Sequence, residues 1–68
     1  MINFDFEIDF NNNSVTSTVD GSCKATSLEN VIARAKNLVT QLEGNVEFVA
    51  INIWDAAKPN QPPVYFSL

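Results

Sequence analysis

The first ten residues alternate strictly between apolar and polar side chains. One parity carries Ile2, Phe4, Phe6, Ile8 and Phe10, and the other carries Asn3, Asp5, Glu7 and Asp9. Because successive side chains of a strand point to opposite faces, this pattern predicts a strand with one apolar face and one carboxylate-rich face. The sheet that contains the strand is therefore expected to be covered on one side and open to water on the other.

A second, more polar strand follows a turn cluster at residues 11–14, where asparagines tolerate left-handed backbone. Valine and serine alternate with threonine from Val15 to Val19. Asp20-Gly21 then interrupts the pattern, either as a tight hairpin turn or, as the preferred interpretation, as a bulge before Ser22–Ala25. A strand of this polarity is expected at an edge of the sheet.

The next segment has the period of an amphipathic helix. Its apolar positions recur every three or four residues: Leu28, Val31, Ile32, Ala35, Leu38, Val39 and Leu42. Thr26 and Glu29 have the spacing of a capping box, and Gly44 is a typical stop signal. The charged side chains of the other face, which include Arg34 and Lys36, are interpreted as a solvated surface.

Two further strands are predicted after the helix. In Asn45–Asp55 both parities are apolar, which is typical of a central strand or of one covered on both faces. One parity carries Val49, Ile51 and Ile53, and the other carries Phe48, Ala50, Asn52 and Trp54. After the proline-rich connection 56–63, the segment Val64–Leu68 is expected to form a short strand. Its inward residues are Val64, Phe66 and Leu68, and Tyr65 points outward.

These elements predict a single α+β domain over residues 1–68, in the order β-β-α-β-β, with one amphipathic helix packed on one face of a four-stranded sheet. Crossover connections are overwhelmingly right-handed, and the polar second strand belongs at an edge, so the strand order is 2-1-4-3 or 2-1-3-4. A core of this size rarely supplies more than about 3–5 kcal/mol net. Packing against a partner or a second copy of the chain is therefore a reasonable source of added stability.

The composition argues against catalysis. The chain has no histidine, which removes imidazole-dependent triads and most zinc sites, and its two glycines are too few for a phosphate-binding loop. Cys23 has no second cysteine to pair with and is interpreted as a small packed side chain. We therefore expect a protein that is not an enzyme and that uses no cofactor and no metal.

Charge and hydropathy restrict the partner and the compartment. Eight carboxylates against four basic side chains give a formal charge of −4, which disfavours nucleic acid and other acidic partners. No apolar run approaches the roughly 20 residues that span a bilayer. The N-terminus lacks the charged region and continuous apolar stretch of a signal peptide, so a cytoplasmic location is expected.

Two sets of side chains are candidates for a binding surface. Asp5, Glu7 and Asp9 lie on one face at a spacing of roughly 6–7 Å, which suits a solvated, aggregation-resistant surface better than a metal or acid–base site. The second set is aromatic. If the parity of Val49, Ile51 and Ile53 faces the helix, then the open side of the sheet presents Phe48, Trp54 and Tyr65. Aromatic side chains are enriched at interface anchors. The alternative is the reverse parity, with Phe48 and Trp54 in the core.

The run from Asp20 to Lys36, Asp-Gly-Ser-Cys-Lys-Ala-Thr-Ser-Leu-Glu-Asn-Val-Ile-Ala-Arg-Ala-Lys, resembles a segment of HicB-type antitoxins. In that family a Gly-Cys strand end is followed by Thr-Leu-Glu-Glu-Ala and a helix. The resemblance implies a protein inhibitor that neutralises a small basic ribonuclease toxin by direct binding. The family's Pro-Asp-Leu-Pro-Gly stretch and appended DNA-binding domain have no counterpart here, so no functional residues are carried over.

The sequence therefore predicts a non-catalytic protein-binding module that acts through the open face of its sheet. An alternative is a small acidic inhibitor, of antitoxin or phage-encoded anti-defence type, that blocks a basic nucleic-acid-binding protein by imitating phosphates. A further alternative is an accessory subunit of an enzyme. The expected partner is another protein, with a homodimer as an option, and no membrane is involved.

Overall fold

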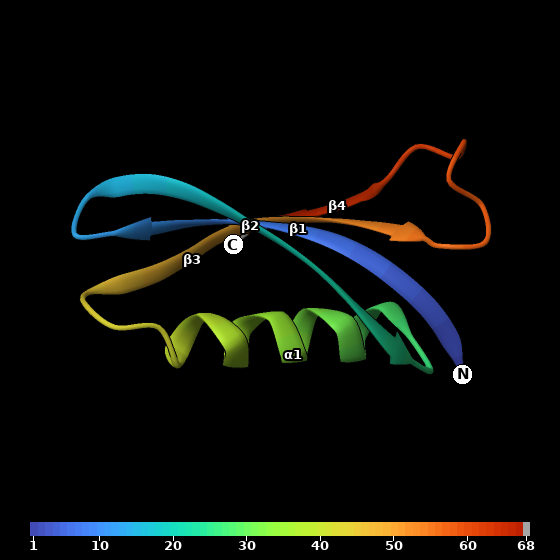
Figure 1. The fold of residues 1–68 in the computed structure, drawn as a ribbon, viewed down its shortest axis with the longest axis horizontal. Helices are drawn as coiled ribbons and strands as arrows, with labels where there is room; N and C mark the ends of the chain where they lie inside the picture. Colours follow the sequence, from blue (N-terminus) through green and yellow to red (C-terminus); the bar gives the residue numbers. More distant parts are fainter. Residues whose placement is uncertain (68) are drawn as a thin grey trace.

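The computed structural model describes residues 1–67, which form four strands and one helix in the order β-β-α-β-β (Figure 1). The strands form one antiparallel sheet in the order β2-β1-β3-β4, and α1 lies against one side of it. The predicted α+β class is thereby confirmed, and the strand order is one of the two that were expected. The inward position expected for Leu68 lies outside the described residues.

The first two strands form a long hairpin. β1 (Ile2–Asn12) pairs residue for residue with β2 (Val15–Ala25). The connecting residues Asn13 and Ser14 both have positive φ, 52° and 70°. Two consecutive left-handed residues are characteristic of the type I′ turn, whose twist matches that of the flanking strands. The turn therefore falls within the predicted cluster.

The interruption predicted at Asp20-Gly21 is wrong, because β2 runs through both residues with no shift of register. Gly21 lies directly opposite Phe6. A Cβ atom at residue 21 would lie 2.5 Å from Cζ of the Phe6 ring. The glycine therefore makes room for an aromatic ring from the neighbouring strand, an arrangement that also compensates the weak strand propensity of glycine.

Helix α1 (Leu28–Thr40) begins one residue later than the capping-box pattern indicates. The N-cap is Ser27, whose Oγ accepts a hydrogen bond from the backbone N–H of Asn30 at 3.2 Å. Thr26 Oγ1 instead accepts a bond from Asn30 Nδ2 at 2.8 Å. Side-chain capping of this kind satisfies an N–H group that has no partner within the helix.

The C-terminus of α1 also differs from the prediction. The helix stops at Thr40, and the expected stop residue Gly44 lies in the following loop with φ of 102°. The tip of the β1–β2 hairpin holds this loop: the Asn13 N–H donates to the Asn45 carbonyl at 3.0 Å, and the Asn45 N–H donates to Asn13 Oδ1 at 3.2 Å. Figure 1 shows the two turns at the same end of the molecule.

The core lies between α1 and the three longest strands. The helix buries Val31, Ala35 and Val39, whereas Leu38 stays 42% exposed and Leu42 is also exposed. The buried stripe of the helix is therefore narrower than its apolar pattern. The buried side chains that form the core are Phe4, Ile8, Phe10, Ala25, Val31, Ala35, Val39, Ile51 and Ile53.

A bulge changes the parity of β3 (Val46–Asp55). Asp9 pairs with Ala50, but the next residue, Phe10, pairs with Phe48, so Val49 is an extra residue between two ladder positions. One extra residue in one strand reverses which side chains face the core beyond that point. The predicted alternation over 48–53 therefore holds only from Ala50 onward.

The bulge divides the predictions for β3. Ile51 and Ile53 are buried under α1 as expected, but Val49 is 37% exposed. Phe48 was expected on the open face and instead packs against the core. β4 (Val64–Ser67) pairs with β3 and directs Phe66 to the covered side, opposite Ile51, as predicted.

Candidate functional site

The open face of the sheet is the surface that the four strands direct away from α1 (Figure 1). Side-chain alternation and the register of the strands define its rows. One row runs across β2, β1 and β3 as Ser22, Asp5 and Trp54. The next runs across all four strands as Asp20, Glu7, Asn52 and Tyr65, and the third as Thr18, Asp9, Ala50 and Ser67.

Carboxylates dominate the centre of this surface. Asp5, Glu7 and Asp9 follow one another along β1, as predicted, and Asp20 of β2 lies directly opposite Glu7. Glu47 of β3 lies opposite Asn11 on the same face. We call these five carboxylates the acidic face.

Few internal contacts balance this charge. Asp9 Oδ1 accepts a hydrogen bond from Thr18 Oγ1 at 2.9 Å. Among residues 1–67, the register places one basic side chain on this face, that of Lys24 at its end, opposite Asn3. Directly opposed like charges on neighbouring strands lower stability by about 0.2–1 kcal/mol. Glu7 and Asp20 therefore impose a cost on the sheet that no described contact offsets.

The aromatic set divides between the two sides of the sheet. Trp54 lies on the open face beside Asp5, and Tyr65, which is 63% exposed, lies beside Asn52. Phe48 lies on the covered side, with its ring centroid 6.4 Å from that of Phe66. The patch predicted from three aromatics thus contains two.

A basic side chain covers the two phenylalanines. Lys36 of α1 places Nζ 5.1 Å from the Phe66 ring centroid and 5.9 Å from that of Phe48. An ammonium group at this distance over an aromatic face is attracted by the ring quadrupole. Lys36, interpreted from the sequence as part of a solvated face, instead closes the side of the core beside β4.

Sequence reasoning missed Asp20 and Glu47 as members of this surface. The hairpin turn contained the signal for Asp20, because a two-residue turn at Asn13-Ser14 requires Glu7 to pair with Asp20. Treating Asp20 as part of an interruption concealed that pairing. The position of Glu47 on the open face could be predicted only with the bulge known, because strict alternation through Val49 places this residue on the covered side.

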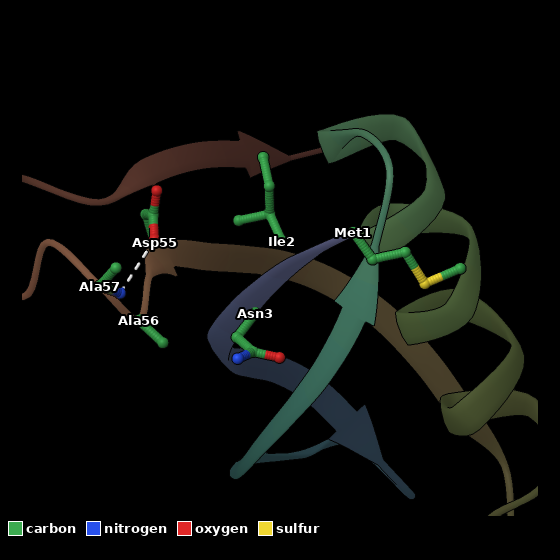
Figure 2. A pocket seen from close by; sticks show the side chains of 6 residues that line it. All are labelled: Met1, Ile2, Asn3, Asp55, Ala56 and Ala57. Atoms are coloured by element: carbon green, nitrogen blue, oxygen red, sulfur yellow. Dashed lines mark hydrogen bonds between the residues drawn. The ribbon is translucent and has the colours of Figure 1, made fainter.

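A pocket of about 460 Å³ lies at the end of the sheet where the N-terminus meets the end of β3 (Figure 2). Its lining comprises Met1, Ile2, Asn3, Asp55, Ala56 and Ala57. Asp55 supplies its single titratable side chain, and Oδ1 of that side chain accepts a bond from the Ala57 N–H at 2.9 Å. The Asp55 carboxylate therefore orders the turn after β3.

Within residues 1–67, no three Asp, Glu, Cys or His side chains come together in a way that would hold a metal ion. Cys23 is partly buried on the covered side of the sheet, where it pairs with Phe4 of β1. No helix among the described residues has the length and apolarity needed to cross a membrane.

Comparison with protein-family models, curated proteins and solved structures gives no match for this chain.

Proposed function

We propose that this chain is a non-catalytic protein-binding module whose acidic face docks on a basic surface of its partner. The observation that carries the proposal is the opposition of Glu7 and Asp20, flanked along β1 by Asp5 and Asp9. Like charges held side by side gain nothing within the chain. A positively charged partner offsets their repulsion, and electrostatic steering raises the association rate constant.

Trp54 and Tyr65 border the acidic face and supply apolar contact area. Trp54 neighbours Asp5 across the β1–β3 pair, and Tyr65 is largely exposed on β4. Tryptophan and tyrosine are enriched among residues that dominate binding energy. The acidic face then determines the rate and specificity of association, and the two aromatics slow dissociation.

A second candidate function is the inhibition of a nucleic-acid-binding protein by phosphate mimicry. It is supported by the distribution of carboxylates over two neighbouring strands, because Asp20 of β2 adds a charge beside the row on β1. Anionic oxygen atoms on neighbouring strands of one surface suit a groove that accepts a nucleic-acid backbone. Such a target would carry clustered lysine and arginine side chains.

The test begins with capture of a partner from the native cell and its identification. Its association rate constant is then measured with the double variant Glu7→Gln/Asp20→Asn. A matched control, Glu29→Gln/Glu43→Gln, removes the same number of charges from residues outside the acidic face. We expect the first variant to associate much more slowly at low salt, with a flatter salt dependence, and the control to behave like the wild type.

The outcomes separate the two candidates. Equal behaviour of the two double variants would refute binding through the acidic face. If the captured partner binds nucleic acid, competition between that nucleic acid and this chain supports phosphate mimicry. Simultaneous binding of both excludes mimicry and leaves the general binding proposal intact.

A further inference from the structure

The two edges of the sheet differ in how they are protected. β4 is four residues long and follows a loop with three prolines, Pro59, Pro62 and Pro63. β2 is eleven residues long, contains no proline and keeps an unbroken register with β1. Short strands, prolines, bulges and charged side chains are the usual means of blocking edge-to-edge pairing. The β2 edge carries the charges of Asp20 and Lys24 and has none of the other three.

The hairpin register shows which backbone groups this edge presents. The pair that flanks the two-residue turn, Asn12 and Val15, is hydrogen-bonded, and hydrogen-bonded pairs alternate with open pairs along an antiparallel ladder. The N–H and C=O groups of the intervening β2 residues therefore point outward. These residues are Thr16, Thr18, Asp20, Ser22 and Lys24.

One contact agrees with this assignment. Arg34 Nη1 of α1 donates to the Lys24 carbonyl at 2.6 Å, so α1 satisfies the last outward carbonyl of the series. The outward groups from Thr16 to Ser22 remain along the free edge. The covered side of the same strand is incompletely buried, with Val15 63% exposed and Val19 and Cys23 only partly buried.

We infer that β2 pairs antiparallel with β2 of a second copy of this chain, with the two-fold axis at Val19. In this register Val19 meets its own counterpart, and Val15 meets Cys23 of the other copy on the covered side. On the open side Asp20 lies opposite a Thr18 hydroxyl. An axis at Asp20 would oppose two carboxylates, and an axis at Thr18 would lose the contact of Val15 with Cys23. The axis at Val19 alone avoids both.

This pairing satisfies the outward backbone groups. Thr16 of each copy pairs with Ser22 of the other, and Thr18 of each copy pairs with Asp20 of the other. Each of these four pairs exchanges two hydrogen bonds, about eight in all. The two sheets become one sheet of eight strands, with both acidic faces on the same side. The inference uses the β2 edge and does not depend on the function proposed for the acidic face.

A cysteine variant tests the register directly. Val15 and Cys23 of the second copy form an open pair, whose Cα atoms lie about 4.5 Å apart, within disulfide range. Under mild oxidation Val15→Cys should form a covalent dimer on non-reducing electrophoresis. The wild type and the control Ser17→Cys, which lies opposite Gly21, should form no covalent dimer. Absence of cross-linking by Val15→Cys, or equal cross-linking by Ser17→Cys, would overturn this register.

Sedimentation equilibrium tests the association itself. The mass of the wild type should rise from 7.5 kDa toward twice that value with concentration. Thr18→Pro removes an outward N–H, keeps the backbone bonds to β1 and loses only the side-chain bond to Asp9, so it should abolish the rise, with the circular dichroism spectrum unchanged. If that variant does not fold, Thr18→Lys provides a second test, because its ammonium group lies opposite Asp9 within the chain and Asp20 of the other copy, so it should keep the fold and tighten the dimer. A wild type that stays monomeric, or a dimer that ignores these substitutions, would refute the inference.

Discussion

Gly21 permits a sharp test of how the hairpin packs. It lies opposite Phe6, and a Cβ atom there would lie 2.5 Å from Cζ and 2.7 Å from Cε1 of the ring, whereas ordinary contact begins at 3.4 Å. The substitution Gly21→Ala therefore requires the ring to retreat by about 0.9 Å, the difference between 3.4 and 2.5 Å. Because Phe6 packs against the buried core, that movement disturbs neighbouring side chains.

The expected cost combines two opposing terms. Overpacking of this kind costs about 1–3 kcal/mol, whereas replacing glycine by alanine returns about 0.4–1 kcal/mol by restricting the unfolded chain. We expect a net loss of about 1–2 kcal/mol from the free energy of unfolding. In a domain of this size each kcal/mol lowers the midpoint of thermal unfolding by about 4–8 °C, so the midpoint should fall by about 5–15 °C.

Thermal unfolding followed by circular dichroism measures this loss, and a double-mutant cycle assigns it to the ring. In a Phe6→Leu background the aromatic ring is absent, so adding Gly21→Ala should leave stability unchanged or raise it. An equal loss in both backgrounds would refute the steric explanation, as would a Gly21→Ala variant as stable as the wild type.

Four further substitutions test other parts of the structure. Ser27→Ala removes the acceptor for the Asn30 N–H and should lower the free energy of unfolding by about 1 kcal/mol, measured in urea. Trp54→Ala should keep the unfolding midpoint and weaken partner binding by about 2 kcal/mol, whereas Phe48→Ala should lower stability by about 2–4 kcal/mol. Cys23→Ala should preserve partner affinity, and a large defect in a well-folded variant would indicate a chemical role for the thiol.

Local patterns were sufficient for the sheet and the helix. β1 has one unbroken alternation, so its carboxylate row was evident from the order of its residues. The helix was evident from its period, but its ends depend on single hydrogen bonds. Ser27 and Thr26 are adjacent, both carry hydroxyl groups, and the pattern alone favoured the wrong one. Leu38 and Leu42 continue the apolar pattern of the helix beyond the area that the sheet covers.

Features that depend on two strands at once were not predictable in the same way. Gly21 has the local signature of a turn, and its role follows only from the Phe6 ring across the ladder. The position of Phe48 likewise depends on Val49 having no partner on β1, a property of the pairing and not of either strand alone. The predicted aromatic patch was therefore wrong for Phe48 alone, the member that the bulge separates from Trp54 and Tyr65.

Deletions in β3 test that explanation of the aromatic patch. Val49 is the extra residue, so its deletion should join Ala50 to Phe48 in a regular ladder and leave every side chain on its present face. Deleting Asn52 removes one residue from the same strand but places Ile51 on the opposite face from Ile53, which empties part of the core. We expect the Val49 deletion to fold, with a loss of about 1 kcal/mol or less because Val49 is partly exposed, and the Asn52 deletion to unfold. Chemical-shift mapping and thermal unfolding would distinguish them. A Val49 deletion that unfolds like the Asn52 deletion, or that moves Phe48 to the other face of the sheet, would refute the bulge as the reason for the faces of β3.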